Sequence, residues 1–218
     1  MTGAHDLRRP ALDARDECHG IVLCGGQSRR MGRDKARLAV GSHTLLEHAV
    51  ATLRPLARSI VLACGSADRY ADLGLPRVLD TLQDGGPLAG LDAGLAAAEA
   101  AGGERAIALA CDMPLVTTEV LRALADVARA RDLDVCFLET EGGLEPLCGV
   151  WRVHTRAAVR AALDAGERKV LSFARFALPS GRKPRVGATT LGAFAGAGTN
   201  VNTPADLDRA QALVGAAR

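Results

Sequence analysis

The sequence predicts an α/β fold of three layers, α/β/α, built around a mostly parallel sheet. Short, continuous apolar runs alternate along the chain with longer stretches of helical patterning. Apolar runs without polar alternation are typical of strands covered on both faces, and strand–helix alternation favours a parallel sheet with right-handed crossovers. With 218 residues, 48% of them hydrophobic, the chain is long enough to bury one sizeable core.

We expect a strand wherever a short apolar run is bounded by glycine or polar residues. SIVLAC and RAIALAC are clear examples of such runs. The expected strands are 21–24, 59–64, 77–80, 105–111, 134–139 and, after the pattern changes near Glu145, 146–153.

Helix-start signals separate these strands. Thr44 and Glu47 have the spacing of a capping box. Thr117 and Thr203 are N-cap residues of later helices, and Pro204 stands at the first helical position of the last one. The expected helices are 45–56, 87–101, 117–131, 155–165 and one that follows 203, while 180–183 and 192–199 are rich in turn-forming residues.

The organisation of the chain is simple. Residues 1–17 are polar and contain no apolar run, so we expect a flexible leader and no signal peptide. Residues 18–218 contain no long linker and no internal repeat, which favours a single domain. No apolar run reaches the ~18–20 residues of a membrane span, so we expect a cytoplasmic protein that contacts no membrane.

The net charge of +2 conceals two basic segments. Residues 25–37 carry five Lys or Arg against one Asp, and residues 152–185 carry nine against Asp164 and Glu167. This pattern indicates anionic ligands bound at defined places, although a solvated surface is the alternative for the second segment. Aromatic residues make up only 3% of the chain, which argues against single-stranded nucleic acid as a partner because bases stack on aromatic side chains.

The cysteines carry no metal or redox motif. There are six, none in a C-x-x-C pair, and no His cluster has zinc spacing. Most of them fall within apolar runs, so we expect buried, reduced thiols. They are Cys18, Cys24, Cys64, Cys111, Cys136 and Cys148.

The richest motif is LCGGQSRRMGRDK at 23–35, directly after the first expected strand. In α/β proteins ligands bind at the carboxyl ends of strands. Gly25 and Gly26 allow the backbone to approach a ligand and to point N–H groups at phosphate oxygens, while Arg29, Arg30 and Lys35 can neutralise a polyphosphate. The motif is neither a Walker A loop nor G-x-G-x-x-G, so the residues alone predict a phosphate-binding loop, with a structural turn as the alternative.

This segment resembles the L-A-G-G-x-S-x-R-M-G-x-D-K signature of the molybdenum cofactor guanylyltransferases, the MobA family. Three further segments resemble that family in the same order: DGGPLAG at 84–90, CDMP at 111–114 and NVNTPADL at 200–207. Together the four motifs cover residues 20 to about 213. The resemblance implies the Rossmann-like, three-layer sheet of the nucleotide-diphospho-sugar transferases, with a nucleotide half at about 18–140 and an acceptor half at about 141–218.

The resemblance also implies an activity. Members transfer GMP from GTP to molybdopterin-bound molybdenum cofactor and release pyrophosphate. GTP and the molybdenum cofactor would then be the partners, with molybdoenzymes or their chaperones as further candidates that receive the product. The attacking phosphate oxygen is already anionic near pH 7, so no general base is required, and His43 and His48 are expected on a helix surface.

Roles for nucleotide-binding residues follow from the same resemblance. Asp112 would bind Mg²⁺, which takes one or two protein carboxylates and keeps several waters; helix capping is the alternative. Asp80 would contact the nucleotide or cap a strand end. Lys35, with Arg29 or Arg30, would stabilise the departing pyrophosphate. The residues expected to bind GTP are Leu23, Cys24, Gly25, Gly26, Lys35, Asp80 and Asp112, and the catalytic set is Lys35, Arg29, Arg30 and Asp112.

Acceptor binding is expected further along the chain. Asn200 and Asn202, two residues apart on an extended segment, would face one way toward a pterin or phosphate; Asx-turn chemistry before Thr203 is the alternative. Arg168 and Lys169 would hold the acceptor phosphate, with an exposed helix face as the alternative.

The nucleotide is predicted from the glycine pair. Guanylyl enzymes resemble L-A-G-G and cytidylyl relatives L-A-A-G, so Gly25 stands where the latter carry Ala and would leave room for a purine edge. Ala63-Cys64-Gly65 departs from the family, several members of which have Asn there. The alternatives are a CTP-dependent molybdopterin cytidylyltransferase, a guanylyltransferase for another phosphorylated small acceptor, and a non-enzymatic nucleotide-binding carrier or regulatory module.

Overall fold

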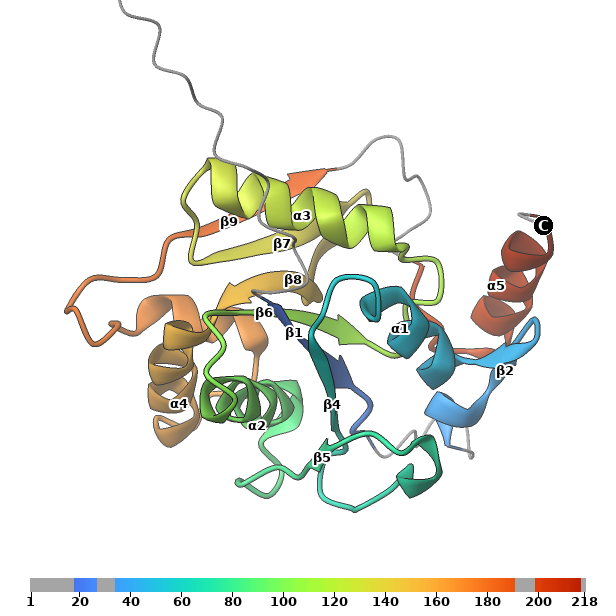
Figure 1. The fold of residues 1–218 in the computed structure, drawn as a ribbon, viewed down its shortest axis with the longest axis horizontal. Helices are drawn as coiled ribbons and strands as arrows, with labels where there is room; N and C mark the ends of the chain where they lie inside the picture. The colour runs from blue at the N-terminus through green and yellow to red at the C-terminus, as the bar shows by residue number, and fades with distance from the viewer. Residues whose placement is uncertain (1–17, 27–33, 191–198, 217–218) are drawn as a thin grey trace, which may run out of the picture.

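The computed structural model describes residues 18–26, 34–190 and 199–216. A seven-stranded sheet with the strand order β5-β4-β1-β6-β8-β7-β9 forms the middle layer, and helices cover both of its faces (Figure 1). The predicted α/β/α fold is confirmed. The strands are β1 (Cys18–Leu23), β4 (Ser59–Ala63), β5 (Arg77–Val78), β6 (Arg105–Ala110), β7 (Val135–Thr140), β8 (Gly143–Arg152) and β9 (Val186–Thr190).

Most of the sheet is parallel, as predicted. β5, β4, β1 and β6 run parallel to one another, and β9 is parallel to β7. β8 lies between β6 and β7 and is antiparallel to both. The chain builds β4 and β5 on one side of β1 and then crosses to β6 on the other side, so the strand order reverses between β1 and β6. This reversal is the point at which open α/β sheets bind ligands.

The helices form the two outer layers. They are α1 (Leu45–Leu53), α2 (Gly86–Ala100), α3 (Thr118–Ala130), α4 (Arg156–Asp164) and α5 (Pro204–Ala216). α1 and α3 bury their apolar sides on one face of the sheet, and α2 and α4 on the other. α2 approaches the sheet closely at Gly94, where a Cβ would lie 2.4 Å from Ile21 Cγ2. The second face also buries Trp151 between Phe137 and Phe173, with ring centroids 5.3 and 4.9 Å apart.

The predicted start of α1 is confirmed in detail. The Thr44 hydroxyl accepts from Glu47 N at 3.2 Å, and the Glu47 carboxylate accepts from Thr44 N at 2.7 Å. This reciprocal capping satisfies two N–H groups that the first turn leaves without helical partners. The pKa of Glu47 is lowered mainly by the bond from the Thr44 N–H.

Several elements were not predicted. A hairpin of β2 (Ala39–Val40) and β3 (His43–Thr44) precedes α1, so the prediction that His43 lies on a helix is wrong. β9 is an edge strand that pairs with β7 through its backbone, and its sequence VGATT has no buried residue that would mark it. Short 3-10 turns are present at Lys35–Arg37, Ala71–Leu73, Val153–Thr155 and Val170–Arg175.

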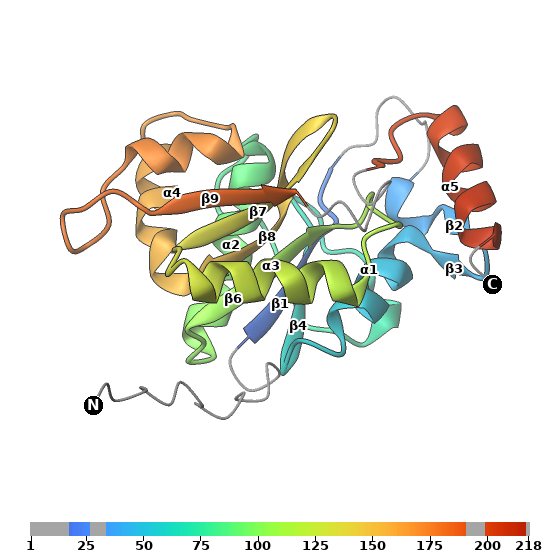
Figure 2. The same cartoon turned by 90° about the horizontal axis from the view of Figure 1, so that it is seen from above.

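The C-terminal helix lies apart from the two main layers (Figure 2). α5 packs on the β2–β3 hairpin, where Leu38, Val40, Leu45, Val201 and Ala210 form a small apolar cluster. Just before the helix, Val201 N donates to Asp112 O at 2.8 Å. The segment that leads into α5 is thereby hydrogen-bonded to the loop that follows β6.

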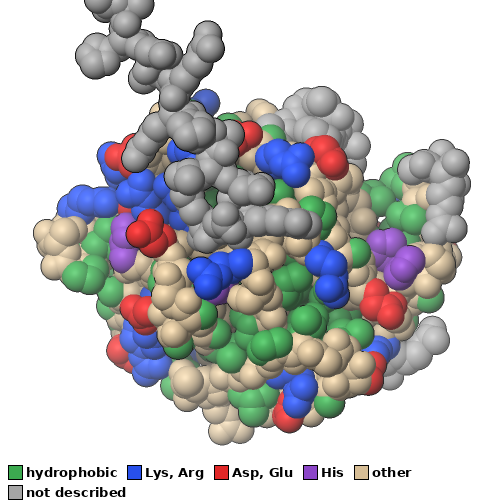
Figure 3. All heavy atoms as spheres, viewed as in Figure 1, with side chains coloured by type: hydrophobic (Ala, Val, Ile, Leu, Met, Phe, Trp, Pro, Cys, Tyr) green, Lys and Arg blue, Asp and Glu red, His purple; other side chains and the backbone are tan. Residues whose placement is uncertain are grey.

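Charged side chains of both signs lie on the surface, and the cysteines lie in the core. On the face shown in Figure 3, basic and acidic side chains are interspersed rather than gathered by sign. All six cysteines are buried thiols, as predicted. Among the described residues, every helix is too short or too polar to cross a bilayer.

Candidate active site

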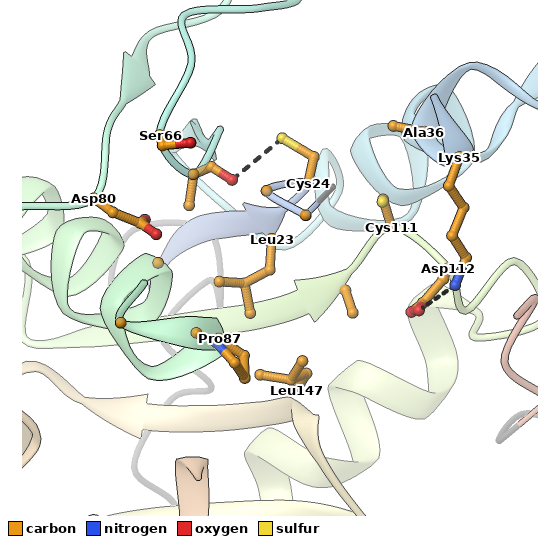
Figure 4. A pocket seen from close by; sticks show the side chains of 18 of the residues that line it. Leu23, Cys24, Lys35, Ala36, Ser66, Asp80, Pro87, Cys111, Asp112 and Leu147 are labelled. Carbon is orange, nitrogen blue, oxygen red and sulfur yellow. Dashed lines mark hydrogen bonds and ion pairs between the residues drawn. The ribbon is translucent and has the colours of Figure 1, made fainter. Parts of the chain in front are cut away.

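A cavity of about 640 Å³ opens at the carboxyl ends of β1, β4 and β6 (Figure 4). Its walls come from the residues that follow these strands and from the turn that leads into α2. The fold thus brings most of the predicted site residues together, and those lining the cavity are Leu23, Cys24, Gly25, Gly26, Lys35, Asp80, Asp112 and Asn202.

The glycine pair has a different physical role from the one predicted. A Cβ on Gly25 would lie 2.6 Å from Gly65 N, so the two strand ends touch backbone to backbone. Gly25 N donates to Ala63 O at 2.9 Å and is directed at that carbonyl rather than at a ligand. The prediction that the Gly25 N–H is directed at phosphate is therefore wrong, while Gly25 still lines the cavity and its contact with a purine stays a prediction. Gly26, with φ +147°, has open space where a Cβ would lie.

Asp80 presents an acceptor oxygen at the wall of the cavity. Asp80 N donates to Gly65 O at 2.9 Å, which fixes the residue beside the end of β4. Its Oδ1 is buried and has no hydrogen-bond partner among the described residues. Burial raises the pKa of this carboxyl. A buried acceptor without a partner is costly unless a donor reaches it, so Asp80 is suited to accept a hydrogen bond from a bound molecule.

Lys35 connects three segments of the chain across the cavity. Its Nζ donates to Asp112 Oδ2 at 2.7 Å and to Asn202 Oδ1 at 2.8 Å. Figure 4 shows Lys35 and Asp112 pointing toward each other from the 3-10 turn and from the end of β6. The side chains are 15% and 26% exposed, so this pair is only partly screened by water.

Asp34 fixes the start of the turn that carries Lys35. Its carboxylate accepts from Ala36 N at 3.1 Å and, through both oxygens, from the Tyr70 hydroxyl at 2.9 Å. Arg69 and Arg37 lie over the Tyr70 ring at 5.2 and 5.1 Å from its centroid. Sequence reasoning missed Tyr70, although a single tyrosine in so aromatic-poor a chain is a usable signal.

The two asparagines reach different partners. Asn202 contacts Lys35, whereas Asn200 Nδ2 donates to Glu145 Oε2 on β8 at 3.1 Å. Burial, with a contribution from Asp112, raises the pKa of Glu145. The two amides thus bond to different side chains, and their joint contact with an acceptor stays a prediction. Glu145 is a further site candidate that sequence reasoning missed, and a carboxylate within an otherwise apolar strand could have marked it.

The predicted acceptor cations lie outside the lining of the cavity. Arg168 donates to the backbone carbonyls of Asp84 at 3.1 Å and Glu167 at 2.8 Å. It therefore ties the turn before α2 to the end of α4. Lys169 is exposed at the start of the Val170–Arg175 turn.

The rest of the second basic segment is largely neutralised within the fold. Asp134, whose side chain is fully buried, accepts from Arg182 at 2.5 and 2.9 Å and from Arg185 N at 2.7 Å. The basic residues of this segment that pair with Asp or Glu are Arg152, Arg156, Arg160, Arg175, Arg182 and Arg185. These pairs support the solvated-surface interpretation for most of the segment.

Arg29 and Arg30 lie outside the described residues. Within the described ranges, no group of three or more His, Cys, Asp or Glu side chains could hold a metal ion. The oxygens of Asp112 and Asn202 nonetheless meet at one cation, the Lys35 ammonium. This donor set suits an ion such as Mg²⁺, which retains much of its water.

The fold and this cavity define an α/β protein with a cavity at the topological switch point of its sheet, where open α/β folds bind ligands. Residues 20–180 match the MobA-like NTP transferase domain. The chain therefore belongs to the MobA-like NTP transferase family.

Relatives that match most of the chain agree with this family assignment. The chain is 38% identical over 152 residues to a probable molybdenum cofactor guanylyltransferase of Carboxydothermus hydrogenoformans, covering 70% of this chain and 74% of the relative. It is 35% identical over 197 residues to a molybdenum cofactor guanylyltransferase of Cereibacter sphaeroides, covering 89% and 96%.

A solved structure supports the fold. The molybdopterin-guanine dinucleotide biosynthesis protein A of Archaeoglobus fulgidus superposes with a TM-score of 0.72 at 23% identity, covering 91% of this chain and 99% of that one. The predicted resemblance and the nucleotide-diphospho-sugar-transferase-like architecture are confirmed.

Proposed function

We propose that this protein transfers GMP from GTP to molybdenum cofactor, whose organic part is molybdopterin, and releases pyrophosphate. The names of relatives that match most of the chain support this reaction. The observation that carries the proposal is the contact of Lys35 with Asp112 at the sheet's switch point. A lysine and a carboxylate at that place suit a triphosphate and its metal ion.

The chemistry is positioning and charge neutralisation. A terminal phosphate oxygen of the acceptor attacks the α-phosphorus of GTP, and the bond to the β-phosphate oxygen breaks. Because that nucleophile is already anionic near pH 7, a general base is not needed. Lys35, with Arg29 or Arg30, stabilises the charge that develops on the departing pyrophosphate.

Mg²⁺ is the proposed cofactor. Asp112 would hold it, and Asn202 Oδ1 could share it, since both groups already meet one cation. A bound Mg²⁺ neutralises and orients phosphate oxygens. Lys35 then exchanges its bond with Asp112 for contacts with phosphate.

The base is recognised at the wall of the cavity opposite Lys35 and Asp112. Leu23, Pro87 and Leu147 offer apolar surface to a flat ring, and the Asp80 carboxylate, with its buried Oδ1, offers acceptor oxygens beside it (Figure 4). Guanine presents N1–H and N2–H donors together, whereas cytosine presents only an exocyclic amine. A carboxylate acceptor therefore favours GTP over CTP.

The acceptor half rests on residues 141–218. Asn200, Asn202, Arg168 and Lys169 remain the proposed contacts for molybdopterin, with Arg168 acting from the rim because carbonyls already engage it. Transfer of the finished cofactor to a molybdoenzyme or its chaperone is a further proposal.

A nucleotide panel tests the function. Purified protein with Mg²⁺ and molybdopterin is given GTP, CTP, ATP or UTP, and pyrophosphate release is measured. Turnover is expected with GTP and not with CTP, ATP or UTP. Preference for CTP would indicate the cytidylyl alternative, and turnover only with another phosphorylated acceptor would indicate a different guanylyltransferase. Tight GTP binding without turnover would indicate a carrier or regulatory module.

A further inference from the structure

The floor of the cavity holds two cysteines on neighbouring strands. β1 and β4 end at the register pair Leu23 and Ala63, and each strand is followed by Cys-Gly: Cys24-Gly25 and Cys64-Gly65. The two sulfur atoms are 4.0 Å apart. Both side chains are buried, at 4% and 0% exposed, and Cys24 lines the cavity.

The backbone spacing suits a covalent bond between them. Neighbouring strands lie about 4.8 Å apart, within the ~4.4–6.8 Å range of Cα separations in disulfides. A disulfide requires the sulfurs to approach to about 2.05 Å, which is a further movement of about 2 Å. Rotation about χ1 of one or both side chains supplies part of this movement.

The environment of Cys64 favours reaction. The Cys24 thiol donates to Cys64 Sγ, and this bond, aided by Arg69, lowers the pKa of Cys64 despite its burial. The thiolate is the reactive form of cysteine. Cys111 also lines the cavity, but burial raises its pKa. Cys111 therefore serves as an internal control for thiol reactivity.

We propose that Cys24 and Cys64 form a reversible disulfide when they meet a peroxide, and that this modification prevents a nucleoside triphosphate from binding in the cavity. One sulfur attacks a peroxide oxygen, which gives a sulfenic acid and one water. The second sulfur then displaces that oxygen as a second water. Two thiols and one hydrogen peroxide thus give one disulfide and two waters, with the peroxide as the oxidant.

The effect on the cavity follows from the glycines. Gly25 and Gly65 are already in backbone contact, since a Cβ on Gly25 would lie 2.6 Å from Gly65 N. We expect the part of the movement that χ1 rotation does not supply to displace the backbone at Gly25 and Gly26, which line the cavity. A displacement of about 1 Å in a catalytic site can cost ~10²-fold in rate. Only this second half of the proposal rests on the proposed function.

Peptide mapping tests the bond directly. The full-length protein is treated with hydrogen peroxide, remaining thiols are blocked with N-ethylmaleimide, and a tryptic digest is analysed by mass spectrometry. The expected product joins residues 16–29 to residues 59–69 and disappears after treatment with dithiothreitol. Cys18→Ser removes the other cysteine of the first peptide, so that the link is assigned to Cys24. Recovery of both peptides only as maleimide adducts, or of a link from Cys24 to Cys111, would overturn the proposal.

A turnover assay tests the consequence. Pyrophosphate release is measured before and after peroxide, and each variant is compared with its own untreated sample. The wild type is expected to lose about 10²-fold, recovered by dithiothreitol. Cys64→Ser is expected to keep its initial rate, while the matched variant Cys136→Ser, altered in the core away from the cavity, responds like the wild type. A linked peptide with unchanged turnover would refute the proposal that the disulfide prevents a nucleoside triphosphate from binding in the cavity.

Discussion

Lys35 Nζ lies 2.7 Å from Asp112 Oδ2, although 77 residues separate them in the chain. Lys35 comes from the turn after the glycine motif, and Asp112 from the loop that follows β6. The contact spans the point where the strand order reverses. It places a cation and a carboxylate in the cavity that we propose binds a triphosphate and its metal ion.

Substitution of either partner is expected to remove turnover without unfolding the protein. Lys35→Ala and Asp112→Ala should each lower pyrophosphate release by ~10²–10³-fold, the usual cost of removing a group that stabilises developing charge. Because the two groups act as a unit, the double variant should lose much less than the product of the single losses. The exposed Asp126→Ala serves as control, and circular dichroism checks folding. Turnover like the wild type in either single variant would contradict the site.

Asp80 should make GTP binding depend on pH. Burial raises its pKa, so the carboxylate becomes protonated, and loses acceptor capacity, at a higher pH than an exposed Asp with a pKa of about 3.9. We expect GTP affinity in the wild type to fall as pH falls through this raised pKa. Asp80→Asn should weaken binding by about 1.5–3 kcal/mol and remove this pH dependence. Calorimetric titrations from pH 4 to 8 measure both, and parallel pH profiles would argue against base contact by Asp80.

Gly25→Ala should disrupt the strand end rather than change the nucleotide. Its Cβ would lie 2.6 Å from Gly65 N, with no flexible side chain to move aside. Turnover with GTP should fall, and turnover with CTP should not appear. Gly142→Ala, in the β7–β8 turn with its nearest atom at 3.5 Å, is the control. A variant that prefers CTP would show that this position reads the base.

Tyr70→Phe should loosen the turn that carries Lys35. The substitution keeps the ring that Arg37 and Arg69 contact but removes the hydroxyl that donates to Asp34. Loss of one such bond costs about 0.5–1.5 kcal/mol of unfolding free energy, measurable by urea denaturation. We expect kcat to fall more than KM rises. An unchanged kcat would mean that Asp34 holds the turn without Tyr70.

Asp134 should contribute stability that depends on pH. Burial acts to raise its pKa, but Arg182, the Arg185 N–H and His154 outweigh burial and lower it. A lowered folded-state pKa gives stability above the unfolded value of about 3.9, lost as pH falls through the folded value. Asp134→Asn should cost about 3 kcal/mol near pH 7 and much less at pH 2.

The neighbouring Asp132→Asn is the matched control for this experiment. Asp132 is 59% exposed in its pairs with Arg152 and Arg185, and Asn tolerates its φ of 50°. It should cost at most about 1 kcal/mol. Equal losses in the two variants, or a loss for Asp134→Asn that does not decrease between pH 7 and pH 2, would refute the assignment.

Local sequence patterns are enough to predict the layers of this fold. Continuous apolar runs such as SIVLAC are typical of covered strands, and Thr44 with Glu47 starts α1 through contacts within a single turn. These features depend on neighbours in the chain, so their signals are local. β9 was missed because its pairing with β7 uses backbone groups, which leave little trace in side-chain pattern.

The three-dimensional structure, in contrast, establishes which groups meet. It shows that the close approach of the Gly65 backbone leaves no room for a Cβ at position 25. It also shows that Asn200 and Asn202 reach different partners and that Cys24 lies beside Cys64. Each of these contacts depends on strand order and register. Those follow from how all the apolar faces pack together, and no single stretch of sequence encodes them.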